Sequence, residues 1–181
     1  YIFINIHSPV TSEVRYISTQ NPESEFQIVL PRVQDTEYDV SHQPGADGGG
    51  GSFFVRTNDG AKTFRLVEAP VANPSKPNWR EIIPARPDVT IESVSAFRGR
   101  IVTEERHRGL IQIHIRDLHR GVSHAIEFPE PAYSAGLGSN AEFDTNLLRF
   151  EYSSLVTPAS VFDYDMETRT RWTILWFLVL I

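Results

Sequence analysis

The sequence predicts an all-β fold, and three observations support this expectation. Four stretches of the 181-residue chain alternate apolar and polar residues on both sides of a polar turn, which is the pattern of a β-hairpin. The hairpins recur at nearly equal intervals: Val14, Phe64, Ile111 and Val161 open their second strands and stand 50, 47 and 50 residues apart. Apolar residues at helical spacing are nearly absent. Together these observations predict repeated antiparallel strands.

The four hairpins occupy residues 1–17, 53–68, 100–115 and 148–164. Asn58, Asp59 and Gly60 give the strongest turn signal, because glycine accepts a positive φ without steric cost. A further strand is expected after each hairpin, at residues 26–30, 80–84, 124–128 and 172–176. Another is expected before the second, third and fourth hairpins, at residues 38–42, 90–97 and 133–138.

Four short strands therefore repeat about every 48 residues, a period typical of a β-propeller blade. We expect a partial β-propeller of about three and three-quarter blades, each of four antiparallel strands, with the first blade lacking one strand. The blades would span residues 1–35, 36–86, 87–131 and 132–176. A propeller arc would then cover residues 1–171, followed by an apolar tail at residues 172–181. The alternative is a two-sheet sandwich in which the equal spacing is accidental.

The composition is that of one ordinary globular domain and excludes several classes of chemistry. The chain has no cysteine, which excludes a disulfide scaffold, a thiolate zinc site and a cysteine nucleophile. Its 23 acidic and 17 basic side chains give a net charge of −6, which argues against nucleic acid as a partner. Because the first residue is Tyr1 and not methionine, we expect a processed, trimmed or fragmentary chain.

Two long segments resemble a known family of peptidases. They are FFVRTNDGAKTFRLVEAP at residues 53–70 and FDTNLLRFEYSSLVTPASVFDYD at residues 143–165. Both are similar to the propeller domain of oligopeptidase B, in the prolyl oligopeptidase family of serine peptidases, and the shorter segments SEVRYI, EYDVSH and HAIEFPEPAYS fit the same region. The chain departs from the family at GADGGGGS (residues 45–52), which resembles a loop expansion, and at the tail WTILWFLVLI, which a frame change or truncation would produce.

The resemblance implies a function and a location. In that family the propeller caps the active site and excludes large folded substrates, while a separate hydrolase domain supplies the catalytic Ser, Asp and His and cleaves after basic residues. The chain would then be the later half of a seven-bladed propeller, a non-catalytic part that gates peptide substrates in a cytoplasmic enzyme. Peptide substrate would be its partner only together with the catalytic domain.

No set of residues in the sequence predicts a catalytic, cofactor-binding or metal site. The G-x-S-x-G pattern of a serine nucleophile is absent, and Ser52 and Ser139, each preceded by glycine, are expected in blade turns. A Ser–His–Asp set assembled between blades around His42 or His114 stays open as an alternative. The six histidines lack metal-site spacing and are expected on separate strands and loops; they are His7, His42, His107, His114, His119 and His124.

Three other patterns admit both a functional and a structural interpretation. The glycines at residues 48–51 lack the lysine of a phosphate-binding loop and predict a flexible loop. The carboxylate pairs Glu104-Glu105 and Glu127/Glu130 could share a proton or a cation, but we expect solvated charges on edge strands and loops. The tail is half as long as a membrane-spanning helix, so a membrane is not an expected partner.

Two alternatives to the gating function follow from the same sequence. The chain could carry weak esterase or peptidase activity of its own, through the Ser–His–Asp set described above. It could also be a structural module that assembles through exposed blade edges. An open arc leaves an apolar blade face uncovered at each end, so we expect a homo-oligomer.

Overall fold

Strands make up nearly all of the regular structure. The computed structural model describes residues 1–45 and 49–176, and within these ranges the helical structure is a single 3-10 turn at Lys76–Asn78. The strands are β1 (Ile2–Ser8), β2 (Thr11–Ile17), β3 (Gln27–Ile28), β4 (Tyr38–Gln43), β5 (Ser52–Thr57), β6 (Arg65–Pro70), β7 (Arg80–Ile83), β8 (Val89–Phe97), β9 (Arg100–His107), β10 (Leu110–Asp117), β11 (Ser123–Ala125), β12 (Tyr133–Leu137), β13 (Leu147–Ser154), β14 (Ser160–Asp165) and β15 (Arg171–Trp176). The predicted all-β fold is confirmed.

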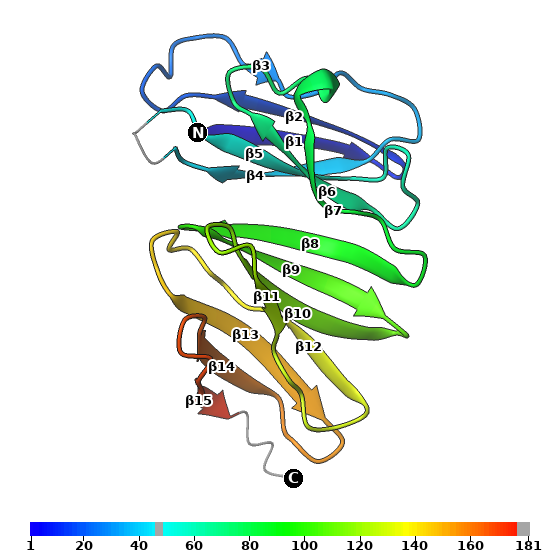
Figure 1. Cartoon of the computed structure of the whole chain (residues 1–181), viewed down its shortest axis with the longest axis vertical. Coiled ribbons are helices and arrows are strands. Elements are labelled where there is room, and N and C mark those ends of the chain that lie inside the picture. The colour runs from blue at the N-terminus through cyan, green and yellow to red at the C-terminus, as the bar shows by residue number, and fades with distance from the viewer. Residues whose placement is uncertain (46–48, 177–181) are drawn as a thin grey trace. The chain divides into compact units, whose positions relative to one another are not determined.

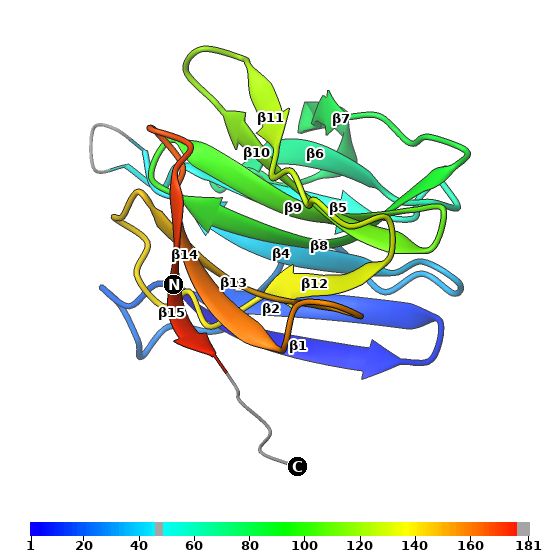
Figure 2. The ribbon, with the colours of Figure 1, turned by 90° about the horizontal axis from the view of Figure 1, so that it is seen from below.

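The strands form four antiparallel sheets in which each strand pairs with its neighbours in the chain (Figure 1). The strand orders are β1-β2-β3, β4-β5-β6-β7, β11-β10-β9-β8 and β12-β13-β14-β15. Figure 2 shows the last of these sheets with β15 at its edge beside β14. Three sheets of four strands and one of three are the arrangement expected of a partial propeller whose first blade lacks a strand. The predicted fold class is therefore confirmed.

The chain divides into two compact units, Tyr1–Thr90 and Ile91–Ile181. In the first unit, apolar side chains of the β1–β3 and β4–β7 sheets form one core, which contains Val14, Tyr16, Val29, Leu30, Tyr38, Phe53, Val55, Val67 and Val71. The Tyr38 hydroxyl lies inside this core, where it donates to the Leu30 carbonyl at 2.8 Å and accepts from the Val14 amide at 2.8 Å. The phenol thus satisfies backbone groups of the neighbouring sheet that burial would otherwise leave unpaired.

The core of the second unit is built from the β8–β11 and β12–β15 sheets. Its buried members are Phe97, Val102, Ile113, Ile115, Ile126, Leu148, Phe150, Tyr152, Tyr164 and Met166. Val102 lies opposite Ile115, and Leu148 opposite Tyr164, so both pairs place large apolar side chains on one face of their sheet. Burying such side chains stabilises the fold by about 1.5–3 kcal/mol each.

One strand begins a residue later than the sequence predicts, and parts of two predicted segments lie outside the described residues. Phe64 has a φ of 63°, so it ends the turn and the strand begins at Arg65. The Phe64 amide donates to the Ala61 carbonyl at 2.9 Å, which closes the turn, and the Arg56 guanidinium lies 3.6 Å from the centre of the Phe64 ring. The glycine-rich residues 46–48 and the tail residues 177–181 lie outside the described residues. No helix in the described part of the chain is long and apolar enough to cross a membrane.

Candidate functional site

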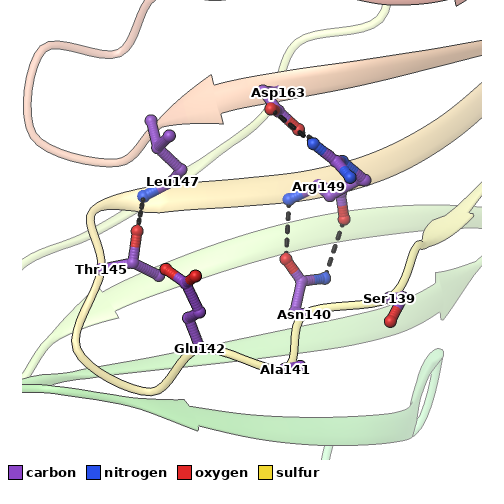
Figure 3. A pocket seen from close by; sticks show the side chains of 8 residues that line it. All are labelled: Ser139, Asn140, Ala141, Glu142, Thr145, Leu147, Arg149 and Asp163. Atoms are coloured by element: carbon purple, nitrogen blue, oxygen red, sulfur yellow. Dashed lines mark hydrogen bonds and ion pairs between the residues drawn. The ribbon is translucent and has the colours of Figure 1, made fainter.

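A cavity of about 410 Å³ lies beside the β12–β15 sheet, where the connection after β12 meets β13 and β14 (Figure 3). Arg149 of β13 faces Asp163 of β14 across the ladder, and the two form a bidentate ion pair with Nε–Oδ1 at 2.8 Å and Nη2–Oδ2 at 2.9 Å. Asn140 donates to the Arg149 carbonyl at 2.9 Å and accepts from the Arg149 amide at 2.7 Å. These contacts fix the loop against the sheet.

Arg149, Asp163 and Asn140, which line this cavity, are already paired with one another. The hydrogen bonds and the charge of Asp163 raise the pKa of the Arg149 guanidinium. Ser139 points away from Arg149 and Asp163 in Figure 3, and no histidine lines the cavity. A serine nucleophile requires a base within hydrogen-bond reach, so this arrangement supports structure and not acyl transfer.

Of the two serines that follow glycine, Ser139 lies in a connection between strands as expected, whereas the expectation of a turn is wrong for Ser52. Ser139 stands in the connection between β12 and β13, whereas Ser52 is the first residue of β5. A Cβ atom at Gly138 would come 3.0 Å from the Arg149 Cγ, so close packing explains the glycine before Ser139. Neither serine begins a helix in the described ranges, so neither has the strand-to-helix turn of a serine hydrolase.

The histidines are spread over the two units, and the residues that the structure describes contain no group of three His, Cys, Asp or Glu able to hold a metal ion. Burial lowers the pKa of His42, whose Nε2 lies 2.8 Å from the Gly50 carbonyl oxygen. His114 Nε2 lies 3.6 Å from Glu105 Oε2 and 3.4 Å from Gln112 Oε1. None of these contacts involves a serine, so they do not support the Ser–His–Asp alternative.

The expectation of solvated carboxylates is wrong for Glu104 and Glu105, because β9 is an interior strand. Glu104 accepts from the Leu137 amide at 2.7 Å and from the Ser93 hydroxyl. Glu105 is only 3% exposed and accepts from the Thr103 hydroxyl at 3.0 Å. Neighbouring residues of a strand point to opposite faces, so the two carboxylates do not share a proton.

Glu127 and Glu130, the other pair, make different contacts. Glu130 accepts hydrogen bonds from the Tyr152 hydroxyl and, at 2.7 Å, from the Thr157 hydroxyl. These bonds lower the pKa of Glu130, the Tyr152 bond having the larger effect. The backbone carbonyl of Glu127, in contrast, accepts from Arg171. Each glutamate therefore anchors a different part of the second unit.

Sequence reasoning missed an apolar cavity of about 300 Å³ in the first unit. Tyr38 and Trp79 line it together with prolines, and the Trp79 indole N–H donates to the Pro74 carbonyl at 3.0 Å. An ion pair between Lys76 and Asp59 at 2.8 Å stands at its border. The run NPSKPNW at residues 73–79 was the available signal, because prolines beside an aromatic residue favour exposed apolar surface.

Comparison with known proteins decides which family has this architecture. The model of the family described as "Prolyl oligopeptidase, N-terminal beta-propeller domain" matches residues 1–174. The chain belongs to this family. The resemblance seen in the sequence is thereby confirmed, and the four sheets are blades of a prolyl oligopeptidase propeller domain.

Individual relatives agree with this membership. The chain is 34% identical over 172 residues to dipeptidyl aminopeptidase BI of Pseudoxanthomonas mexicana and 30% identical over 169 residues to protease 2 of Moraxella lacunata, covering 94% and 93% of this chain. It covers 23% of each relative. The structure of oligopeptidase B from Leishmania major matches 98% of this chain and 26% of its own with a TM-score of 0.85 and 26% identity. The chain thus spans about a quarter of these proteins.

Proposed function

We propose that this chain is the non-catalytic propeller portion of an oligopeptidase-B-like serine peptidase and that it gates the entry of peptide substrates. The observation that carries the proposal is the family match over residues 1–174, nearly the whole chain. The named relatives are peptidases, and one similar structure is oligopeptidase B from Trypanosoma brucei with covalently bound antipain. The described Ser, His and Asp contacts offer no competing catalytic centre.

The sheet topology supports a gate made of rigid units. β4 and β12 each end a sheet and pair with only one strand, so one side of their backbone has no partner in its own sheet. The first strand of each blade lines the central channel of a propeller. A ring of such strands, held by apolar packing between blades, admits an extended peptide but excludes a folded domain of larger cross-section.

Charge favours one class of peptide. The chain carries 23 acidic against 17 basic side chains, a net charge of −6. A net negative charge attracts cationic ligands and raises their local concentration, with an effect that weakens at high salt. The proposed gate would therefore admit peptides with basic residues more readily than acidic ones, in accord with cleavage after Arg or Lys.

The gating proposal is tested with one cleavable Arg-containing sequence in three settings. The whole enzyme should cleave it in a short peptide and in a destabilised, unfolded carrier domain, but not in the stably folded form of the same carrier. The unfolded carrier is the matched control, because it has the same length and composition. Equal kcat/KM values for the folded and unfolded carriers would contradict a gate.

The 181-residue chain by itself tests whether the propeller is non-catalytic. It should turn over neither a fluorogenic arginine amide nor a p-nitrophenyl ester. Turnover of both substrates that disappears on a single Ser→Ala exchange would overturn this part of the proposal and establish a catalytic serine in the propeller.

A further inference from the structure

A second cavity in the second unit has basic walls. It has a volume of about 500 Å³ and lies between the end of β11 and the turn that joins β14 to β15. His124, Tyr164, Arg169 and Arg171 line it, and Glu127 is the one acidic residue among the lining residues. Two guanidinium groups against one carboxylate leave the cavity with a net positive charge.

Arg169 is held in an unusual backbone conformation beside this cavity. Its φ is 61°, in the left-handed region that is costly for residues with a Cβ atom. The turn enforces this conformation, because the Arg169 amide donates to the Asp165 carbonyl at 2.8 Å and the Asp165 carboxylate accepts from the amides of Glu167 and Thr168 at 2.8 and 2.9 Å. Backbone strain of this kind is common at binding sites.

The guanidinium of Arg169 differs from the other arginines near it. Arg100 pairs with Glu167, and Arg120 pairs with Glu167 at 3.1 Å and with Asp117 at 4.0 Å, so two carboxylates compensate these two charges. Within the described part of the chain, the Arg169 side chain makes no hydrogen bond or ion pair. Arg171 donates from Nη1 to the Glu127 carbonyl at 3.0 Å, a neutral acceptor that leaves its charge uncompensated.

His124 supplies an unsatisfied polar atom at the same place. Its Nε2 is buried and has no hydrogen-bond partner. The imidazole lines both this cavity and a smaller one of about 40 Å³, and Arg169 lines both as well. Burial lowers the pKa of His124, and the charges of Arg169, Arg100 and His114 lower it further, which favours the neutral ring. Buried polar atoms without partners are rare and call for an explanation.

We propose that this cavity binds an oxyanion, a carboxylate or phosphate group held between the guanidinium groups of Arg169 and Arg171 and beside the His124 imidazole. Guanidinium groups recognise such anions by parallel charge-assisted hydrogen bonds. The anion would compensate the charge of Arg169 and give the His124 ring, after a small rotation, an acceptor for its N–H. The proposal concerns a site that the gating function does not use, and it stands or falls independently of that function.

The binding test is a titration of the 181-residue chain followed by the His124 ring proton signals in NMR spectra, assigned with a His124→Asn variant. The probes are inorganic phosphate and acetyl-Ala-Ala with a free C-terminus, with its C-terminal amide and chloride of equal ionic strength as controls. Saturable shifts with phosphate or the free peptide, and none with the amide or chloride, support the site. Absence of saturable shifts with both probes overturns it.

Matched arginine variants separate a built site from general charge attraction. Arg108 also has a positive φ, 51°, in the turn between β9 and β10, but it does not line the cavity. Arg169→Gln should weaken anion binding by about tenfold or more, the loss expected for a charge-assisted bond, whereas Arg108→Gln should leave it unchanged. Equal affinities in the two variants would overturn the assignment.

Replacing Arg169 by glycine provides a second test, in which a loss of anion binding cannot be attributed to a loss of folding stability. Arg169→Gly removes the guanidinium and also the strain of a positive φ. This variant should melt at the same or a higher temperature than the parent chain and still lose anion binding. A parent-like affinity in this variant would contradict the role of Arg169.

Discussion

At the scale of single residues, Tyr152 shows how burial and a hydrogen bond act together. The phenol is only 5% exposed, its ring stacks on Phe128 with centroids 5.0 Å apart, and its hydroxyl donates to Glu130. Burial raises the pKa of Tyr152 to about 12, and the Glu130 hydrogen bond and charge contribute to the increase. The same bond lowers the pKa of Glu130. The protonated phenol and the ionised carboxylate therefore stabilise each other.

We predict that Tyr152→Phe lowers the free energy of unfolding at pH 7 by about 1 kcal/mol, because the ring stays packed while one partly exposed hydrogen bond is lost. The parent chain should lose this advantage as pH falls below 4.5, the ordinary pKa of Glu130, since the folded-state pKa of that carboxyl is lowered. The parent chain should also lose this stability advantage between pH 10.0 and about 12, where Tyr152 ionises in the unfolded but not in the folded chain.

Urea unfolding across this pH range measures the effect, and an ultraviolet titration should show one late-titrating tyrosine fewer in the variant. Tyr133→Phe is the matched control, because Tyr133 also packs on Phe128, with ring centroids 4.7 Å apart, and burial raises its pKa as well. Its hydroxyl makes no hydrogen bond within the described ranges. An equal loss of stability in both variants would contradict the role of the Glu130 contact.

At the scale of elements, the β4–β5 hairpin depends on one glycine. Gly51 has a φ of 73°, and a Cβ atom there would lie 2.0 Å from the Gln43 carbonyl oxygen. Gly60, in the turn after β5, has a similar φ of 67° but no atom within 4 Å of its virtual Cβ. The two glycines share the backbone conformation and differ in the space around them.

We therefore predict that Gly60→Ala costs about 1 kcal/mol, the cost of the left-handed conformation alone, and that Gly51→Ala costs clearly more. The additional cost arises because the clash separates Gln43 from Ser52, the last pair of the β4–β5 ladder. It also disturbs the bond from the Val71 amide to the Gly51 carbonyl, 3.1 Å long. Chemical denaturation of both variants measures the difference, and equal costs would show that the hairpin end adapts freely.

The same elements show what the sequence could predict. Period-2 alternation and turn residues are local, so the hairpins and the strands flanking them were found from the sequence. Phe64 was misplaced because it still belongs to the turn: its amide donates to the Ala61 carbonyl at 2.9 Å and its φ is 63°. Glu105 was misjudged because burial depends on how sheets pack. The Arg169 cavity was missed, since its walls come from β11 and from a turn about forty residues later in another sheet, and only the packing of the two sheets brings them together.

At the scale of the whole molecule, one face of the β1–β3 sheet exposes large apolar side chains. Ile2, Ile4 and Ile28 are 49%, 42% and 45% exposed. They share a face, because Ile2 and Ile4 alternate along β1 and both Ile4 and Ile28 lie opposite Arg15 of β2. Arg15 lies between Ile4 and Ile28 on this face and pairs with Glu13 at 2.8 Å. Large exposed apolar side chains grouped around a paired charge are a composition found at interaction surfaces.

We propose that the 181-residue chain forms a homo-oligomer through this isoleucine face, most simply a two-fold dimer in which the same face of each copy is covered. Each square ångström of apolar surface removed from water contributes about 25 cal/mol, and the Glu13–Arg15 ion pair between Ile4 and Ile28 would set the register of the two copies. Sedimentation should then show concentration-dependent association above the monomer mass of 20.5 kDa.

Ile4→Glu should shift this association toward monomer, because it places a second carboxylate beside Arg15, which already pairs with Glu13, and association would have to bury the added charge. Leu155→Glu is the matched control: Leu155 is 96% exposed in the connection after β13, so the same charge change there should leave the sedimentation profile unaltered. The melting temperature of both variants, measured at low concentration where monomer prevails, separates loss of contact from loss of fold. A concentration-independent monomer in the parent chain, or equal association of the two variants, would show that the isoleucine face does not mediate self-association.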